Sequence, residues 1–450
     1  MNARSHPVLR ALRHRNYRLF FGGQSVSLVG TWITRIATAW LVYRLTGSEL
    51  LLGIVGFCSQ IPMLVLAPFA GVLVDRWDRH RILLLTQGLS LLQSASLAIL
   101  TLGGWITVTE IIVLQLVQGM INSFDTPARQ AFVVQMVEDR EDLPNAIALN
   151  SSMVNASRIL GPSIGGVLIA ALGEGWCFTV DAVSYLAVIG SLLAMRVVSV
   201  PRAPADTHVL AELRTGFEYV SRFVPVRALL LMIALVGTMA MPYNTLMPVV
   251  AKQVLHGGPH TLGILMTAAG IGALAGTLYL ASRRSVLGLG RVILISTTAL
   301  SFALIAFSFS HTLWISLLLL PFIGGGMMVQ TASTNTILQT VVDEKLRGRV
   351  MAFYATAILG TLPIGSLLAG AVASRIGAPR TILIGGCACL AGAIWFAFRR
   401  PALARLIRPV YMERGIIPWE EATYQGVVVT GVADVEPSPP GASNADRPRE

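Results

Sequence analysis

"PFAGVLVDRWDRHRILL", residues 68–84, decides the fold because it joins two apolar stretches through a short charged turn. Six of the seven residues from Asp75 to Arg81 are charged or titratable. Taken alone, such a turn could be a solvated loop, a patch that binds nucleic acid or a moving part of a larger machine. The sequence on either side of the turn separates these possibilities.

The composition of the whole chain is that of a protein surrounded by lipid. Of its 450 residues, 54% are hydrophobic and 13% are charged, and the mean hydropathy is +0.68. An ordinary soluble domain carries about 25% charged residues. We therefore expect most of this chain to lie within a membrane.

A membrane-spanning helix needs about 20 predominantly apolar residues, and the sequence offers twelve such stretches. They cover residues 19–43, 50–74, 82–103, 106–125, 146–172, 176–196, 227–250, 261–281, 291–309, 312–338, 349–373 and 379–398. The sequence thus predicts an all-α membrane protein with twelve transmembrane helices.

The basic residues predict the orientation, because lysine and arginine are retained on the cytoplasmic side of a membrane. With the N-terminus inside, 28 of the 34 lysines and arginines fall in cytoplasmic segments. The net charge of +11 is then a consequence of topology, which argues against a nucleic acid partner. The basic N-terminal segment has no small-residue cleavage signature, so we expect a retained first span. Both termini should be cytoplasmic and the protein should lie in the cytoplasmic (inner) membrane.

The spans divide six and six around the longest polar interruption. We expect an N-terminal six-helix bundle at 1–196, a cytoplasmic linker at 197–226 and a C-terminal six-helix bundle at 227–398. The proline-rich residues 399–450 should form a largely disordered cytoplasmic tail. The two halves also echo each other at an offset of about 200 residues: "AGVLVDRW" precedes "AGTLYLAS" by about 205. Weak internal repetition of this kind is typical of secondary transporters.

The charged turn resembles a motif of the major facilitator superfamily, found between its second and third helices. The matching residues are Gly71, Asp75, Arg76, Arg79 and Arg81, while Asp78 stands where that family more often has glycine. A second resemblance, to the helix-five motif typical of exporters, rests on Gly161, Pro162, Gly165 and Gly166 in "NASRILGPSIGG". "FDTPARQAF", from Phe124 to Phe132, resembles a narrower branch that includes the enterobactin exporter and macrolide efflux proteins. These resemblances imply the two-bundle fold and an export function.

Each motif has a gating interpretation and a simpler one. Asp75 could pair with arginines or with a helix N-terminus and hold the cytoplasmic side shut, or the turn could be an ordinary solvated loop. The glycines of the second motif could allow a helix to approach a moving neighbour closely, or they could serve ordinary packing. With twelve spans around the turn, we favour gating for both.

Charged residues within spans are costly and so become functional hypotheses. Counted at about 1.5 Å per residue from the outer helix ends, Arg35 lies about 13 Å deep, Asp181 about 8 Å and Arg158 about 20 Å. Arg35 and Asp181 could form a structural ion pair. Alternatively, Asp181 could exchange protons, and an unpaired Arg158 could attract anionic cargo. Gln115 stands where many proton antiporters carry arginine, and no histidine falls within the expected spans, which leaves Asp181 as the only acid well inside a helix.

Polar residues on the helices expected to line the cavity complete the candidate pathway for substrate or protons. The full set is Trp32, Arg35, Gln115, Asn122, Asn155, Arg158, Asp181, Asn244, Gln330 and Asn335. Most side chains of this kind join helices by hydrogen bonds, so each could instead be structural.

The sequence predicts a secondary active transporter that exports a small amphipathic molecule, drug-like or siderophore-like, by alternating access and with protons as the coupling ion. The partners are the small-molecule substrate and the lipid bilayer, with no nucleic acid. The alternatives are an importer of a small nutrient with the same fold and a membrane-embedded enzyme. We expect no cofactor, no metal site and no catalytic residues, because the chain has no phosphate-binding loop and no converging nucleophile or metal-ligand groups.

Overall fold

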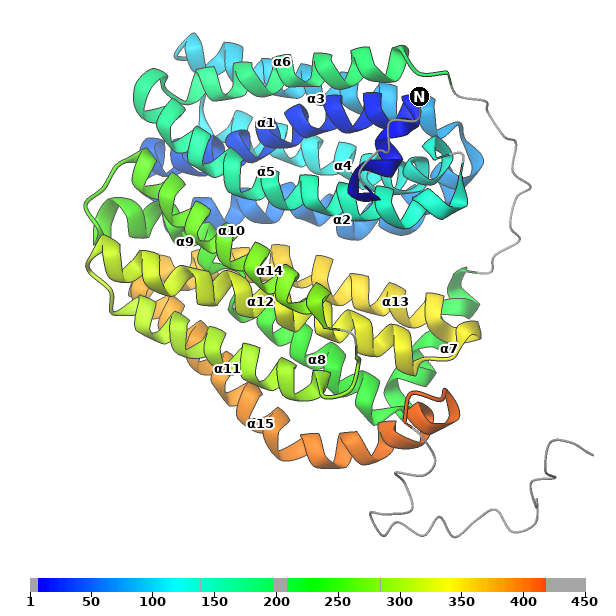
Figure 1. Cartoon of the computed structure of the whole chain (residues 1–450). Helices are drawn as coiled ribbons and strands as arrows, with labels where there is room; N and C mark the ends of the chain where they lie inside the picture. Colours follow the sequence, from blue (N-terminus) through cyan, green and yellow to red (C-terminus); the bar gives the residue numbers. More distant parts are fainter. Residues whose placement is uncertain (1–6, 138, 197–208, 284, 418–450) are drawn as a thin grey trace, which may run out of the picture. The chain divides into compact units, whose positions relative to one another are not determined.

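A computed structural model of the chain describes residues 7–137, 139–196, 209–283 and 285–417. In these ranges the regular elements are helices, and no strand occurs. The chain divides into two compact units, Met1–Pro401 and Ala402–Glu450. The features described below belong to the first unit, and its all-helical architecture confirms the predicted fold class (Figure 1).

The first half of the chain contains six long helices that contact one another. They are α1 (Arg15–Thr46), α2 (Glu49–Arg76), α3 (Arg79–Leu102), α4 (Val108–Met136), α5 (Leu143–Leu172) and α6 (Glu174–Leu193). A short 3₁₀ helix, Pro7–Arg13, precedes α1, and another, Arg140–Asp142, precedes α5. We call α1–α6 the N-terminal helix group. In Figure 1, α1, α3 and α6 run side by side at one edge of this group.

The second half begins with α7 (Val209–Arg222), which lies in the segment expected to be a linker. It is followed by α8 (Val224–Met239), α9 (Tyr243–Val249), a π turn (Val250–Val254), α10 (Pro259–Ser282), α11 (Leu289–Ser308), α12 (Leu313–Val341), α13 (Glu344–Leu359), α14 (Thr361–Ile376) and α15 (Ala378–Glu413). We call α8–α14 the C-terminal helix group. The remaining linker residues, 197–208, and residues 418–450 of the tail lie outside the described residues.

Eleven of these helices or joined helices are long and apolar enough to cross a membrane. Two expected spans, 227–250 and 349–373, are each built from two helices that meet at a break, near Pro242 and at Gly360. The expected span 106–125 is part of α4, which is long enough but is not among the eleven. Its polar residues, including Gln115, Gln118, Asn122 and Asp125, lower its hydropathy.

Helix ends coincide with capping residues that the sequence supplies. Gly47 ends α1 with a φ of 62°, a left-handed conformation that costs glycine little. Ser48 then caps α2, and its hydroxyl accepts a hydrogen bond from the Leu51 amide at 3.3 Å. Gly173 (φ 88°) makes the turn between α5 and α6 in the same way. These tight turns force consecutive helices to run in opposite directions.

The two helix groups touch through glycines on two pairs of helices. A Cβ atom on Gly166 of α5 would lie 2.9 Å from the Gly263 Cα of α10 and 3.0 Å from the Pro259 carbonyl oxygen. A Cβ atom on Gly53 of α2 would lie 3.0 Å from the Gly370 Cα of α14. Such distances are shorter than real Cβ contacts, so only glycine permits these two backbone approaches.

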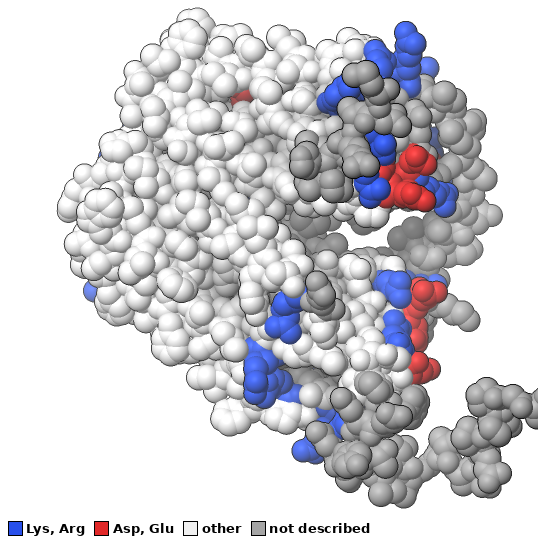
Figure 2. Space-filling model, in the orientation of Figure 1, with Lys and Arg blue, Asp and Glu red and all other residues white. Residues whose placement is uncertain are grey.

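Charged residues mark one end of the helices. On the face shown in Figure 2, most basic and acidic side chains lie at the end that carries the N-terminal segment, and the flanks show few charged side chains. We call this end, where α2 ends and α3 begins, the charged end. Gly53 lies near the start of α2 and Gly166 near the end of α5, so both glycine contacts lie toward the opposite end.

Substitution of Gly166 by leucine should destabilise the protein, because the atoms that the new side chain meets are backbone atoms that cannot rotate away. Overpacking of this kind costs about 1–3 kcal/mol. We expect a lower midpoint of thermal unfolding in detergent. Gly190→Ala, where a Cβ meets nothing within 4 Å, should unfold at or above the wild-type temperature. Equal midpoints for Gly166→Leu and wild type would contradict the contact.

Candidate functional site

The charged turn, Asp75–Arg81, joins α2 to α3, and Asp78 in this turn caps α3. The Asp78 carboxylate accepts hydrogen bonds from the backbone amides of His80 at 2.9 Å and Arg81 at 3.3 Å. Aspartate is a favoured N-cap residue because it pairs with amides that have no partner within the helix. This gives a physical reason for Asp78 at a position where the superfamily more often has glycine.

Asp75 and Arg79 form an ion pair within this turn. The Arg79 guanidinium lies 3.3 Å from an Asp75 carboxylate oxygen, and it also donates to the Ala131 carbonyl of α4 at 3.4 Å. The two partners differ in environment: the Arg79 side chain is 7% exposed and that of Asp75 is 73% exposed. Among the described side chains, the contacts of Asp75 and Arg79 stay within the N-terminal helix group.

The other residues of the motif are more accessible. Arg76 and Arg81 are exposed. A Cβ atom on Gly71 would meet nothing within 4 Å, so in this conformation packing does not require glycine there. The structure therefore brings Asp75 and Arg79 together and leaves Gly71, Arg76 and Arg81 apart from them.

The glycines of the second motif place α5 between its neighbours. Gly161 packs directly against the Trp32 side chain of α1, and a Cβ on Gly165 would lie 3.3 Å from the Ile33 Cα. Pro162 is buried, and its carbonyl oxygen would lie 2.6 Å from a Cβ on Gly263 of α10. This motif thus contacts α1 on one side and, with Gly166, α10 on the other.

Asp125 is a buried acid that the sequence reasoning missed. Its carboxylate accepts hydrogen bonds from Thr86 at 3.0 Å and Gln87 at 2.7 Å, and it pairs with Arg129 at 3.3 Å. The expectation that Asp181 is the only acid well inside a helix was wrong, because α4 continues eleven residues past the expected end of its span at residue 125. The i, i+4 spacing of Asp125 and Arg129 was the available signal.

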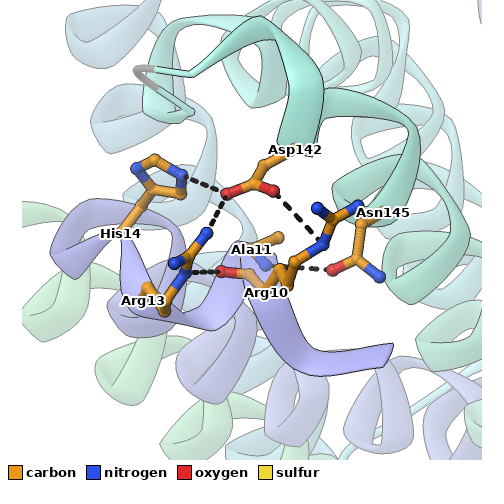
Figure 3. A network of polar contacts seen from close by, with 6 residues as sticks. All are labelled: Arg10, Ala11, Arg13, His14, Asp142 and Asn145. Atoms are coloured by element: carbon orange, nitrogen blue, oxygen red, sulfur yellow. Dashed lines mark hydrogen bonds and ion pairs between the residues drawn. The ribbon is translucent and has the colours of Figure 1, made fainter. Parts of the chain in front are cut away.

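A second missed acid, Asp142, holds the N-terminal segment against α5 (Figure 3). Its side chain is 3% exposed and lies 3.6 Å from Arg10, 3.1 Å from Arg13 and 3.2 Å from His14. Nearby, the Asn145 side chain accepts a hydrogen bond from the Ala11 amide at 2.9 Å. We call these six residues the Asp142 network. Its basic members all precede the first expected span, and of these Arg10 and Arg13 were interpreted only as topological charges.

The polar residues expected along the pathway mostly bond within or between neighbouring helices. Gln115 donates to Thr38 of α1 at 3.3 Å, which joins α4 to α1. Asn122 accepts from Gln118, Asn155 donates to the Ser151 carbonyl, Asn244 donates to the Met241 carbonyl, and Asn335 accepts from Gln339. Gln330 is fully buried, and its amide nitrogen has no hydrogen-bond partner in the described part of the chain.

Arg35 and Asp181 do not form the ion pair considered above. Asp181 is 2% exposed and accepts a hydrogen bond from the Ser94 hydroxyl of α3 at 2.9 Å, while its other carboxylate oxygen has no partner among the described residues. The Arg35 guanidinium instead lies over the Trp32 ring, 4.7 Å from its centroid. Depth was a poor guide because it does not determine which neighbour a side chain contacts: Arg35 lies over Trp32, whereas Asp181 bonds to α3.

Arg158 shares the same ring. Its guanidinium carbon lies 5.5 Å from the Trp32 centroid, and its Nε atom is buried without a hydrogen-bond partner in the described residues. Its backbone faces the C-terminal helix group, since a Cβ atom on Gly270 of α10 would lie 3.2 Å from the Arg158 carbonyl oxygen. We call Trp32, Arg35 and Arg158 the Arg–Trp cluster.

Replacement of Asp142 by asparagine should release the N-terminal segment, because three basic side chains lose their common anion. Trypsin should then cleave after Arg13 or Arg15 faster than in wild type. Glu141→Gln, which changes the exposed neighbouring acid, serves as the control. Equal cleavage rates for Asp142→Asn and Glu141→Gln would show that the network does not anchor the segment.

Comparison with known proteins places this arrangement in a family. The family described as transmembrane secretion effector matches residues 7–408. The staphyloferrin A transporter of Staphylococcus aureus is 28% identical over 85% of this chain and 96% of its own length. Macrolide efflux protein A of Streptococcus pyogenes is 25% identical over 83% of this chain and 94% of its own. An enterobactin exporter of Shigella boydii is 27% identical over 81% of this chain and 86% of its own.

The fold is also found among solved structures. A bacterial homologue of the human lysosomal transporter Spinster, in an inward-facing and occupied conformation, superimposes with a TM-score of 0.65. The sequences are 13% identical, and the match covers 91% of this chain and 98% of the other. Sequence and fold agree with the resemblance found in the motifs. The chain is therefore a multi-pass membrane transporter, not an enzyme, and belongs to the transmembrane secretion effector family of the major facilitator superfamily.

Proposed function

We propose that this transporter is a secondary active exporter of a small amphipathic molecule, drug-like or siderophore-like, that works by alternating access. The relatives named for macrolide efflux and enterobactin export support the direction. Import of a small nutrient is the competing function on the same fold. Transport into inside-out membrane vesicles, rather than into right-side-out vesicles, distinguishes export from import.

The observation that carries alternating access is the uneven contact between the helix groups. The glycine contacts of α5 with α10 and of α2 with α14 hold the groups together toward one end. At the charged end, Figure 2 shows an open gap between the groups. When two packed helix groups are in contact at one end and apart at the other, rocking of the groups closes the open end and opens the closed one.

The proposed topology follows from the basic residues. Residues 1–196 and 227–398 form the two six-helix bundles, residues 197–226 the linker and residues 399–450 the tail, although α15 continues as one helix to Glu413. The charged end faces the cytoplasm, and both termini lie on that side of the inner membrane. The gap at the charged end is then the route by which cargo enters from the cytoplasm.

Gating is assigned to the two motifs. When the groups close at the charged end, exposed Asp75 is available to pair with the C-terminal group, while buried Arg79 keeps it oriented. Gly71, Arg76 and Arg81 complete this latch. Gly161, Pro162, Gly165 and Gly166 form the surface on which α5 closes against α1 and α10.

Proton coupling is assigned to Asp181. A buried carboxylate without a cationic partner is costly when ionised and tolerable when protonated. Asp181 can therefore take up a proton in this conformation and release it when water reaches the site. The remaining pathway is proposed to include Trp32, Arg35, Gln115, Asn122, Asn155, Arg158, Asn244, Gln330 and Asn335.

The Asp181→Asn variant tests coupling. Cargo is first identified by efflux from a pump-deficient strain against a small library of siderophores and drugs. The variant should still equilibrate that cargo down its gradient in vesicles but should lose pH-driven accumulation, by at least tenfold, because asparagine carries no exchangeable charge. Normal accumulation by a normally expressed variant under an imposed pH difference would rule out Asp181 as the proton carrier.

The Asp75→Asn variant tests the latch. Its transport rate should fall at least tenfold while its abundance in the membrane stays normal, because Asp75 is 73% exposed and Arg79 keeps its hydrogen bond to the Ala131 carbonyl. Asp78→Asn is the matched control from the same turn, since asparagine caps a helix as well as aspartate does. If both variants transport alike, the turn is an ordinary loop.

A further inference from the structure

The Arg–Trp cluster places two cations on one aromatic ring between the helix groups. Trp32 and Arg35 lie one turn apart on α1, and Arg158 reaches the same ring from α5. The contact depends on Gly161, one turn beyond Arg158, because this glycine lets α5 pack directly against Trp32. Gly270 of α10, in the C-terminal group, packs against the Arg158 backbone.

Neither guanidinium has an anionic partner in the part of the chain that the structure describes. The buried acid Asp181 bonds to Ser94, and the ion pairs of the described residues involve other arginines. Arg158 Nε is buried without any hydrogen bond. The two like charges also repel each other. A cation–π contact contributes about 0.5–2 kcal/mol. It supplies no hydrogen-bond acceptor for Arg158 Nε, although buried polar groups are normally paired.

The position of the cluster indicates where a compensating anion comes from. Arg158 lies fifteen residues from the start of α5 and fourteen from its end, or about 21 Å from each at 1.5 Å per residue. This depth is beyond the reach of a lipid headgroup. Arg35 is nevertheless exposed rather than enclosed by protein, which leaves room for an anion beside the cluster.

We propose that the Arg–Trp cluster binds the carboxylate of the transported molecule, so that the cargo class is an amphipathic organic anion. This proposal rests on the export function proposed above, since it assigns its binding site. A guanidinium pairs with a carboxylate through two parallel hydrogen bonds, which a primary amide of the same shape cannot match. The site therefore selects acids over their neutral analogues, while the apolar body of the cargo packs on the surrounding aromatic and aliphatic side chains.

The test is a binding measurement on the purified full chain in detergent, at pH 7.5 and low salt. The probes are three matched pairs: octanoate with octanamide, benzoate with benzamide, and 2-naphthoate with 2-naphthamide. At least one acid should bind to wild type at least tenfold more tightly than its amide. If no acid binds more tightly than its amide, the proposal is wrong.

The variants locate the preference. Arg35→Gln and Arg158→Gln should each weaken binding of the preferred acid about tenfold and leave binding of its amide unchanged. Arg158→Lys should keep part of the preference, since it keeps the charge and loses the fork of donors. Arg291→Gln, at an exposed position on α11, is the control and should bind as wild type. A preference that survives in the double variant Arg35→Gln with Arg158→Gln would place the anion elsewhere.

Failure of the anion site can be distinguished from failure of the proposed export function. If a glutamine variant fails to fold, as seen by size-exclusion chromatography, the wild-type acid and amide pairs still decide the question. Binding also requires no transport: a protein that imports, or does not transport, can still prefer the acid. Conversely, a protein that exports normally but binds acid and amide alike keeps the export function and overturns the anion site.

Discussion

Two backbone contacts between glycines hold this molecule in its observed conformation. Gly166 meets Gly263, and Gly53 meets Gly370, at distances that exclude any side chain. The contacts are related by the internal repeat: Gly263 follows Gly53 by 210 residues, and Gly370 follows Gly166 by 204. Each half of the chain therefore contributes one glycine helix of each kind, and the two halves meet as a symmetric pair. Separation of α5 from α10 would break one side-chain hydrogen bond, which Thr267 donates to the Ile159 carbonyl at 3.3 Å.

Close helix packing also determines where the charged side chains of the interior lie. Close packing of α5 on α1 brings Arg158 to Trp32, while Asp181 lies on α6, on the other side of α1, and bonds to α3. The interior thus contains cations and an acid that do not neutralise one another. Unpaired charges in an apolar surrounding are retained at a cost in stability. This cost is consistent with the proposed roles, in which Asp181 carries protons and the two arginines bind an anionic cargo.

Much of the fold could be predicted from sequence because membrane spans are long and strongly apolar. The all-helical class, the family and most helix positions follow from the hydrophobic stretches and the Asp75 motif. The α4 helix escaped full prediction because its polar face lowers its hydropathy, and this hid Asp125. Breaks near Pro242 and at Gly360 are likewise local bends inside apolar stretches, which hydropathy does not register.

The candidate site was harder to predict, because partners depend on which way a helix faces. Depth along the helices suggested that Arg35 and Asp181 could meet, yet the side chains contact different neighbours. The Asp142 network joins residues about 130 positions apart through a loop and a 3₁₀ helix, and hydrophobic periodicity does not predict contacts in such segments. Motif resemblance singled out the Asp75 turn, but only coordinates separate buried Arg79 from exposed Arg76.

Alternating access requires that the glycine contacts open when the charged end closes. Distance measurements between spin labels test this requirement most directly. In a background without the four native cysteines, one pair of labels at Leu50 and Ser374 reports on the glycine end. A second pair at Val134 and Gln339 reports on the charged end; all four positions are exposed. Cargo and pH conditions that support transport should lengthen the first distance and shorten the second in the same sample. If both distances stay constant while vesicles transport cargo, the account is wrong.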